Sequence, residues 1–221
     1  MKKILLSLAV LATGAAAQAQ DQPFAFKQGD ILLEGSLRAN TEDNKTEMVK
    51  TSTFDFTPKA GYFVTDKFAV GLGLNIGSGK VENYTDVNED RRIEKSNNVG
   101  FEVFGRYYIA DLNRFQPYGE LGIGYNSMGG EITRYNEATS TTITTDLDKT
   151  NRFGVNATLG FNYFVTPKIA INFALSNLIG FNSEKVDVSG AKATTDFHAN
   201  INNFNNFFST ATYGAALKLC S

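Results

Sequence analysis

The sequence of 221 residues has no tryptophan, a single cysteine, a single histidine and only four prolines. Cys220 has no second cysteine to pair with, so an intramolecular disulfide is excluded. After residue 19, polar or charged residues interrupt every apolar run, so no later segment is predicted to cross a membrane as a helix. The net charge of −2, without a basic patch among aromatics, argues against nucleic acid as a partner.

The first residues have the pattern of a secretory signal. Lys2 and Lys3 precede a short apolar stretch, and Ala17-Gln18-Ala19 supplies the small residues that signal cleavage needs. We therefore predict a signal peptide over residues 1–19 and one exported domain over residues 20–221. Because a disulfide is excluded, closure of a β-sheet on itself is the expected source of stability.

Side chains after the signal alternate with a period of two, which is typical of β-strands. In the stretch after Phe68, large apolar residues occupy one set of alternate positions, or one parity. The other parity holds Ala69, Gly71, Gly73 and Asn75. Pro58 interrupts one alternating run, and a bulge is expected there. The alternation predicts about eight strands, near residues 30–40, 51–64, 68–76, 98–109, 116–127, 152–163, 169–179 and 206–221.

The polar parity carries charges of both signs and many glycines. Glycine weakens a solvent-facing strand, but small residues beside large ones fill the narrow lumen of a barrel. We therefore predict that the apolar parity faces lipid and that the charges pair inside, in a lumen too full for a wide pore. The predicted lumen network comprises Glu34, Arg38, Asp55, Lys59, Glu102, Arg106, Glu120, Arg152 and Lys218.

Short and long connections alternate along the chain. Short turns fall at residues 65–67, 111–114 and 166–168, and long polar segments at residues 41–50, 80–95, 128–149 and 182–203. Tight periplasmic turns and longer extracellular loops are typical of outer-membrane barrels. The fold class is therefore predicted to be all-β, a closed antiparallel up-and-down transmembrane β-barrel of about eight strands. An even strand number places both termini on the periplasmic side.

Two local patterns add to this prediction. The stretch from Tyr62 to Val70 is repeated in similar form from Tyr163 to Ile171, so one hairpin is used twice. Within the predicted long loops, residues 131–135 and 142–145 have the composition of strands that continue beyond the bilayer. A protruding, threonine-rich ribbon offers backbone edges to a partner, such as a host or envelope protein.

With its hairpins at residues 61–76, 105–125 and 160–175, the chain resembles the small outer-membrane β-barrel family, the OmpX/OmpA-type or porin-family barrels. The resemblance implies a monomer in contact with outer-membrane lipid and lipopolysaccharide, inserted by the barrel-assembly machinery, with a structural or adhesive role. Family members commonly end on an aromatic residue, whereas this chain ends Leu219-Cys220-Ser221. A wall-binding domain after the barrel is not predicted.

Signals for catalysis or metal binding are weak. His198 has Asp196 nearby but no serine at a recognisable spacing, so no catalytic residue is predicted. Residues 86–90 partly match a calcium loop, but Arg91 replaces the required glycine and Asn97 the required glutamate. We therefore predict no enzyme activity, cofactor or metal site. Two alternatives stay open: a secreted, soluble lipocalin-like barrel that binds an apolar ligand, and a membrane-embedded lipid-modifying enzyme.

Overall fold

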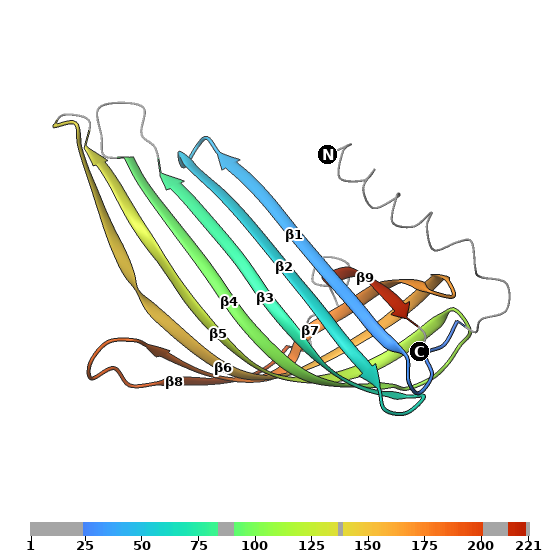
Figure 1. Ribbon diagram of the computed structural model, residues 1–221. Helices are drawn as coiled ribbons and strands as arrows, with labels where there is room; N and C mark the ends of the chain where they lie inside the picture. Colours follow the sequence, from blue (N-terminus) through green and yellow to red (C-terminus); the bar gives the residue numbers. More distant parts are fainter. Residues whose placement is uncertain (1–23, 84–90, 137–138, 201–211, 220–221) are drawn as a thin grey trace.

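The computed structural model describes residues 24–83, 91–136, 139–200 and 212–219; the predicted signal peptide lies outside them. The described chain is built from antiparallel strands (Figure 1). No helix among these residues is long and apolar enough to cross a membrane. The strands are β1 (Ile31–Asn44), β2 (Val49–Phe63), β3 (Phe68–Asn83), β4 (Arg91–Tyr108), β5 (Phe115–Asn136), β6 (Thr141–Thr166), β7 (Ile169–Val186), β8 (Thr194–Ala199) and β9 (Thr212–Leu219).

The sheet closes into a ring of eight strands. Each strand from β1 to β7 pairs with the next, β7 pairs with β9, and β9 pairs with β1. The predicted antiparallel up-and-down barrel of about eight strands is thus confirmed. β8 is an addition, because it pairs only with the part of β7 beyond β9, from Ile179 to Glu184. It falls inside the segment of residues 182–203 that we predicted to be a loop.

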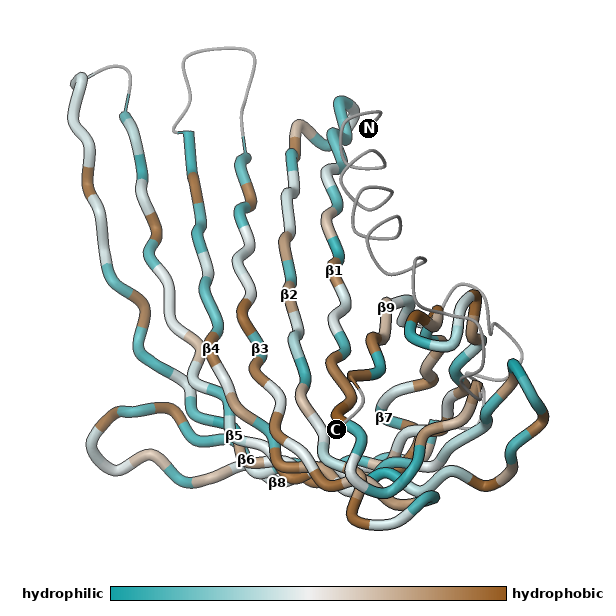
Figure 2. Tube along the Cα trace, turned by 45° about the vertical axis from the view of Figure 1, so that its right-hand side comes forward, coloured by the Kyte–Doolittle hydropathy of each residue, from teal (hydrophilic) through white to brown (hydrophobic). Residues whose placement is uncertain are grey.

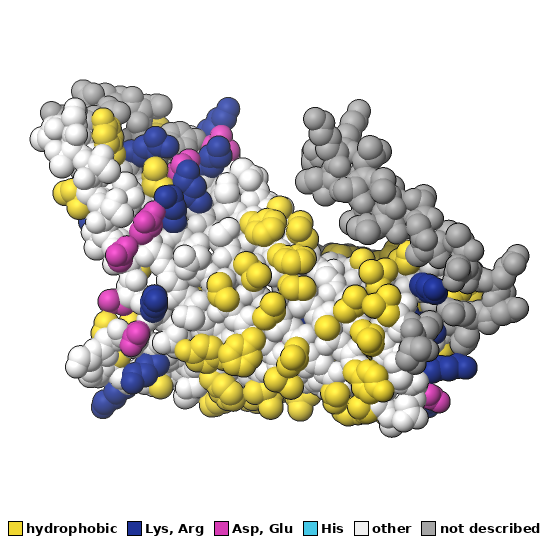
Figure 3. All heavy atoms as spheres, in the orientation of Figure 1, with side chains coloured by type: hydrophobic (Ala, Val, Ile, Leu, Met, Phe, Trp, Pro, Cys, Tyr) yellow, Lys and Arg dark blue, Asp and Glu magenta, His cyan; other side chains and the backbone are white. Residues whose placement is uncertain are grey.

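The apolar parity faces outward, as predicted. Leu72, Val99 and Phe101 are 65%, 62% and 57% exposed, whereas Arg106 on the opposite parity is 1% exposed. Figure 3 shows many hydrophobic side chains gathered over the lower part of the barrel. Aromatic side chains such as Tyr107 lie on this surface near the strand ends, where amphipathic rings favour the membrane interface.

Two of the short turns use the same threonine contact. In the β2–β3 turn, Thr65 Oγ1 accepts a hydrogen bond from the Phe68 amide at 3.0 Å. In the β6–β7 turn, Thr166 Oγ1 accepts one from the Ile169 amide, also at 3.0 Å. The hairpin repeated in the sequence is therefore repeated in structure. These connections, with the β4–β5 turn, define the turn end of the barrel, and the opposite end is the ribbon end.

The predicted long loops are largely strand, which corrects the sequence-based boundaries. β5 and β6 have 22 and 26 residues, whereas about 9–11 residues suffice to cross a bilayer. The extra length continues β1–β6 as one curved sheet beyond the ring, while the β7–β8 hairpin diverges from it (Figure 1). In Figure 2 this sheet is mostly polar along its upper part, so we call it the polar arm.

Pro58 causes no bulge, contrary to expectation. The β2–β3 register is the same on both sides of it, with Phe56 opposite Ile76 and Lys59 opposite Gly73. A proline lacks only its own N–H, so one hydrogen bond between the strands can be missing while the pairing of the neighbouring residues stays in register. In the β5–β6 pairing the register shifts between Met128 and Gly130 of β5, where β6 contains one extra residue.

We predict that labels on β4 will report opposite environments at neighbouring positions. With Cys220→Ser as background, a nitroxide at Val103 should collide with lipid-soluble oxygen, because Val103 is 52% exposed on the outer face. A nitroxide at Glu102 should instead be reached from water, because Glu102 lines the lumen. Electron paramagnetic resonance accessibility in bilayers measures both. Equal oxygen accessibility at the two positions would contradict the inside–outside assignment.

Candidate functional site

The lumen is packed by large side chains that lie over glycines of neighbouring strands. A Cβ added to Gly71 on β3 would lie 2.5 Å from the ring of Phe104 on β4. A Cβ on Gly122 of β5 would lie 2.7 Å from the carboxylate of Glu102 on β4. Gly73 leaves room in the same way between Lys59 and Glu102. The glycines therefore allow large inward side chains to meet across the axis.

Five of the predicted lumen charges form one connected network. Arg106 is bound by two carboxylates: its Nη1 donates to Glu34 Oε2 at 2.7 Å and its Nε to Glu120 Oε2 at 2.7 Å. Lys59 Nζ donates to Glu120 Oε1 at 2.6 Å and to Glu102 Oε1 at 2.8 Å. Pairing of this kind is what buried charges require. Three carboxylates and two cations leave the network one negative charge in excess.

The other four predicted charges lie elsewhere. Arg152 pairs with Glu184 across β6 and β7, and both side chains are more than a third exposed. Lys218 lies at the turn end, 3.5 Å from Asp30. Arg38 and Asp55 face each other in the β1–β2 register, but no ion pair joins them to other described residues. The alternation in the sequence identified which side chains of each strand point inward. The height of each charged side chain along the barrel axis decides which charges meet.

An aromatic cluster fills the turn end, and its central member precedes the first strand. Phe26 is 3% exposed and stacks on Phe63 with ring centroids 4.4 Å apart. Its ring also contacts Tyr108 and Phe164 at 5.4 Å. Lys218 Nζ holds the segment by donating to the Ala25 carbonyl at 2.6 Å. This segment was not predicted from the sequence, because the spacing of Phe24 and Phe26 does not continue into a longer alternating run.

Buried amides and phenols connect the aromatic cluster to the charge network. Asn172 Nδ2 donates to Tyr118 Oη and to Asn162 Oδ1, both at 2.7 Å. Asn162 Nδ2 donates in turn to Tyr108 Oη at 3.0 Å. The Tyr118 ring lies 4.0 Å from the guanidinium carbon of Arg106, a cation–π contact. From the turn end upward, the lumen is thus filled first by aromatics and amides, then by charges.

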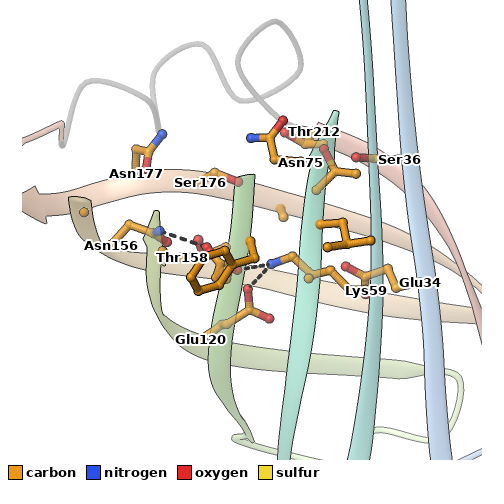
Figure 4. A pocket seen from close by; sticks show the side chains of 18 of the residues that line it. Glu34, Ser36, Lys59, Asn75, Glu120, Asn156, Thr158, Ser176, Asn177 and Thr212 are labelled. Carbon is orange, nitrogen blue, oxygen red and sulfur yellow. Dashed lines mark hydrogen bonds and ion pairs between the residues drawn. The ribbon is translucent and has the colours of Figure 1, made fainter. Parts of the chain in front are cut away.

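Above the network the lumen widens into a polar cavity of about 330 Å³. Lys59 and Glu120 point toward each other at its floor, and Asn75, Ser176 and Thr212 line its upper part (Figure 4). Lys59 and Glu102 keep 17% and 22% of their side chains exposed, so water reaches the top of the network. The cavity can hold polar solutes or ordered water, because its walls present amides and hydroxyls.

The polar arm presents a free strand edge at the ribbon end. From Thr150 onward β6 pairs with β7, but over Thr141–Asp148 its only strand partner in the described chain is β5. Every residue of that segment is exposed. Within the arm, Lys95 on β4 pairs with Glu131 on β5 at 2.7 Å, which links neighbouring strands above the barrel.

His198 lies on the exposed β7–β8 hairpin. Its Nδ1 lies 3.1 Å from Asp196 Oδ2, and this hydrogen bond holds the pKa of the Asp196 carboxyl below its ordinary value. Among the described residues no serine or threonine hydroxyl bonds to His198. Over the same ranges, no three His, Cys, Asp or Glu side chains are grouped as metal ligands would be. Residues 86–90, which partly match a calcium loop, lie outside the described residues, and the described chain resumes at Arg91.

Comparison with known proteins agrees with this architecture. The family model of the outer membrane protein beta-barrel domain matches residues 5–205. The chain belongs to this outer-membrane β-barrel family. Its apolar exterior therefore faces the hydrocarbon of the outer membrane, which makes the alternative of a soluble lipocalin-like barrel wrong.

Several solved structures are similar to the chain, and OprG, with a TM-score above 0.5, shows the same fold. The outer membrane protein OprG from Pseudomonas aeruginosa is 16% identical, covers 90% of this chain and 100% of its own, and has a TM-score of 0.52. Ail of Yersinia pestis is 13% identical with a TM-score of 0.34, covering 87% and 99% of the two chains. Neisserial surface protein A is 14% identical with a TM-score of 0.31, covering 86% and 96%. Among curated proteins, no sequence matches the chain.

We predict that adding one methyl group inside the lumen destabilises the barrel. Gly71→Ala should lower the free energy of unfolding by about 1–3 kcal/mol, because its Cβ meets the Ala60 carbonyl and the Phe104 ring. Gly35→Ala is the matched control, since its Cβ would lie 3.9 Å from the nearest atom. Urea unfolding in lipid vesicles gives both values. Equal stability of the two variants would contradict the packing argument.

We also predict unequal roles for two arginines. Arg106→Gln should cost about 3–5 kcal/mol of unfolding free energy, because it leaves Glu34 and Glu120 buried without their shared cation. Arg152→Gln should cost less than about 1 kcal/mol, because its pair with Glu184 is solvated. The temperature at which the folded gel band disappears should fall for Arg106→Gln alone. A similar fall in both variants would mean that burial does not determine how much each arginine contributes to the stability of the barrel.

Proposed function

We propose that this outer-membrane barrel binds a protein partner of the host or envelope through its polar arm, and that its closed lumen has no transport role. The observation that carries the proposal is the length of the strands beyond the apolar surface. On β5 that surface reaches Tyr125, and residues 126–136 continue at about 3.3 Å each, or about 35 Å along the strand. Shielding the barrel alone would not require ordered strands of this length.

The lumen supports a structural rather than a channel role. Arg106, Glu120 and Tyr118 are each at most 5% exposed and lie across the interior of an eight-stranded ring. A ring of this size leaves an interior just wide enough for side chains. The aromatic cluster around Phe26 lies across the same path at the turn end. We therefore propose a lumen plugged at two heights, with the polar cavity open only toward the ribbon end.

A non-enzymatic role is the second element of the proposal. His198 lies on an exposed hairpin and hydrogen-bonds a carboxylate rather than a nucleophile. The chemistry of a membrane-embedded lipid-modifying enzyme would need both groups at one site. In its place we propose contacts with outer-membrane lipid and lipopolysaccharide, insertion by the barrel-assembly machinery, both termini on the periplasmic side, and one copy per barrel within its own membrane.

Trimming the arm tests the proposal. We expect that replacing residues 131–146 with Asn-Gly will remove attachment to a host-cell monolayer while the barrel itself still folds. Gly130 and Leu147 are paired, so a two-residue turn can join them without changing the register. Attachment is measured with bacteria that carry equal amounts of intact or trimmed protein, and folding is checked by heat-modifiable gel migration. Unchanged attachment by the trimmed protein would refute binding through the polar arm.

A further inference from the structure

The free edge of β6 is unusually permissive for strand addition. Its sequence from residue 141 to 148 is Thr-Thr-Ile-Thr-Thr-Asp-Leu-Asp, without proline, glycine or lysine. Ile143 is 59% exposed and Leu147 is 36% exposed. Native edge strands are normally short, bulged, covered or protected by inward charges, since an open edge is a template for another strand. This edge is flanked by a bulge below, and no other strand of the described chain pairs with it over Thr141–Asp148.

The same edge is complementary to itself in one antiparallel register. When Thr145 of one copy lies opposite Thr145 of another, Ile143 lies opposite Leu147, and this apolar pair occurs twice by symmetry. Asp146 then faces Thr144, and Asp148 faces Thr142, so no carboxylate directly opposes another. Thr145 is also the midpoint of the segment from Thr141 to Lys149 that precedes the pairing with β7.

Neighbouring registers lose these features. A shift by one residue in either direction places Ile143 opposite Asp146 or Asp148. A shift by two residues either opposes the two Asp146 side chains directly or places Ile143 opposite Thr145. Like charges directly opposite are unfavourable in a sheet, and apolar pairs are favourable. Among the registers within two residues of it, only the one centred on Thr145 pairs Ile143 with Leu147 while opposing no two carboxylates.

We propose that the free edge of β6 pairs with the same edge of a second copy, about a two-fold axis at Thr145. This proposal rests on the proposed function of the polar arm and takes the envelope partner of that arm to be a second copy of this chain. Two curved sheets would then join into one continuous sheet, with the two Ile143–Leu147 contacts on the same face.

The geometry places the two copies in opposing membranes. A two-fold axis that makes strands antiparallel must be perpendicular to them. Strands of membrane barrels tilt by about 35–45° from the barrel axis, so two copies upright in one membrane cannot oppose their β6 strands. Antiparallel pairing instead brings the second barrel from the facing surface. The edge thus links one cell surface to another, and each barrel stays monomeric within its own membrane.

Vesicle tethering tests the pairing with purified protein. Proteoliposomes labelled with two lipid dyes should tether through the intact protein, as measured by fluorescence cross-correlation. Ile143→Lys should lower tethering about tenfold, because both apolar pairs of the symmetric contact are lost. Leu147→Glu should lower it similarly. Mixing Ile143→Lys vesicles with Leu147→Glu vesicles should restore it, since lysine then faces glutamate and the remaining leucine faces isoleucine.

A cross-link fixes the register directly. With Cys220→Ser as background, Thr145→Cys should form an intermolecular disulfide between vesicles, because opposite residues in an antiparallel pair have Cα atoms about 4.5–5.5 Å apart. Ile132→Cys is the matched control, as Ile132 lies beside Thr145 on the next strand. Two Ile132 positions would be three strand spacings apart, about 14 Å, which is too far for a disulfide.

Three results would overturn the proposal: no tethering by the intact protein, no restoration in the mixed vesicles, or cross-linking of Ile132→Cys as strong as that of Thr145→Cys. Each is separable from failure of the proposed function. If the trimmed arm loses host-cell attachment while Ile143→Lys keeps both attachment and vesicle tethering, the arm binds a foreign partner and the self-pairing is wrong. If trimming changes neither attachment nor tethering, both are wrong.

Discussion

The structure depends on the match between large inward side chains and glycines on the neighbouring strands. Phe104 occupies the space that a side chain on Gly71 would need, and Glu102 does the same at Gly122. Without these gaps, an eight-stranded ring could not close around residues as large as arginine and phenylalanine. The glycines that weaken each strand locally are therefore what allows the barrel interior to be dense.

Dense packing also explains how charges are tolerated in the lumen. Arg106 and Glu120 are almost completely buried, and each keeps at least two charged partners because neighbouring glycines bring the strands' side chains together. Burial strengthens these ion pairs but makes the loss of one partner costly. Arg152, which lies higher in the lumen, pairs with Glu184 in contact with solvent. How much each charge contributes to stability depends on its height in the barrel rather than on the strand that carries it.

The sequence was sufficient for what repeats with a period of two, and insufficient elsewhere. Alternation identified the outward face of β3 and β4, and the repeated hairpin identified two turns with the same threonine contact. The polar arm was only partly predicted, because both of its faces are polar and the alternation fades. Phe26 was missed because its role depends on Phe63, Tyr108 and Phe164, which are distant in sequence. Partners of Arg152 and Lys218 depend on register, which composition does not specify.

The proposed role of the polar arm follows from the packing of the lumen. Side chains inside the ring are fixed by their glycine neighbours, so most changes there cost stability before they create a new contact. The arm has no such restriction, yet it inherits the order of the barrel because its strands are continuous with those below. The extra residue of β6 opposite Gly129 reverses the side-chain parity: Phe153 faces outward below it, whereas Leu147 lies opposite Gly130 on the inward parity above it. One inserted residue thus turns Ile143 and Leu147 of the β6 edge to the opposite face of the sheet from Phe153.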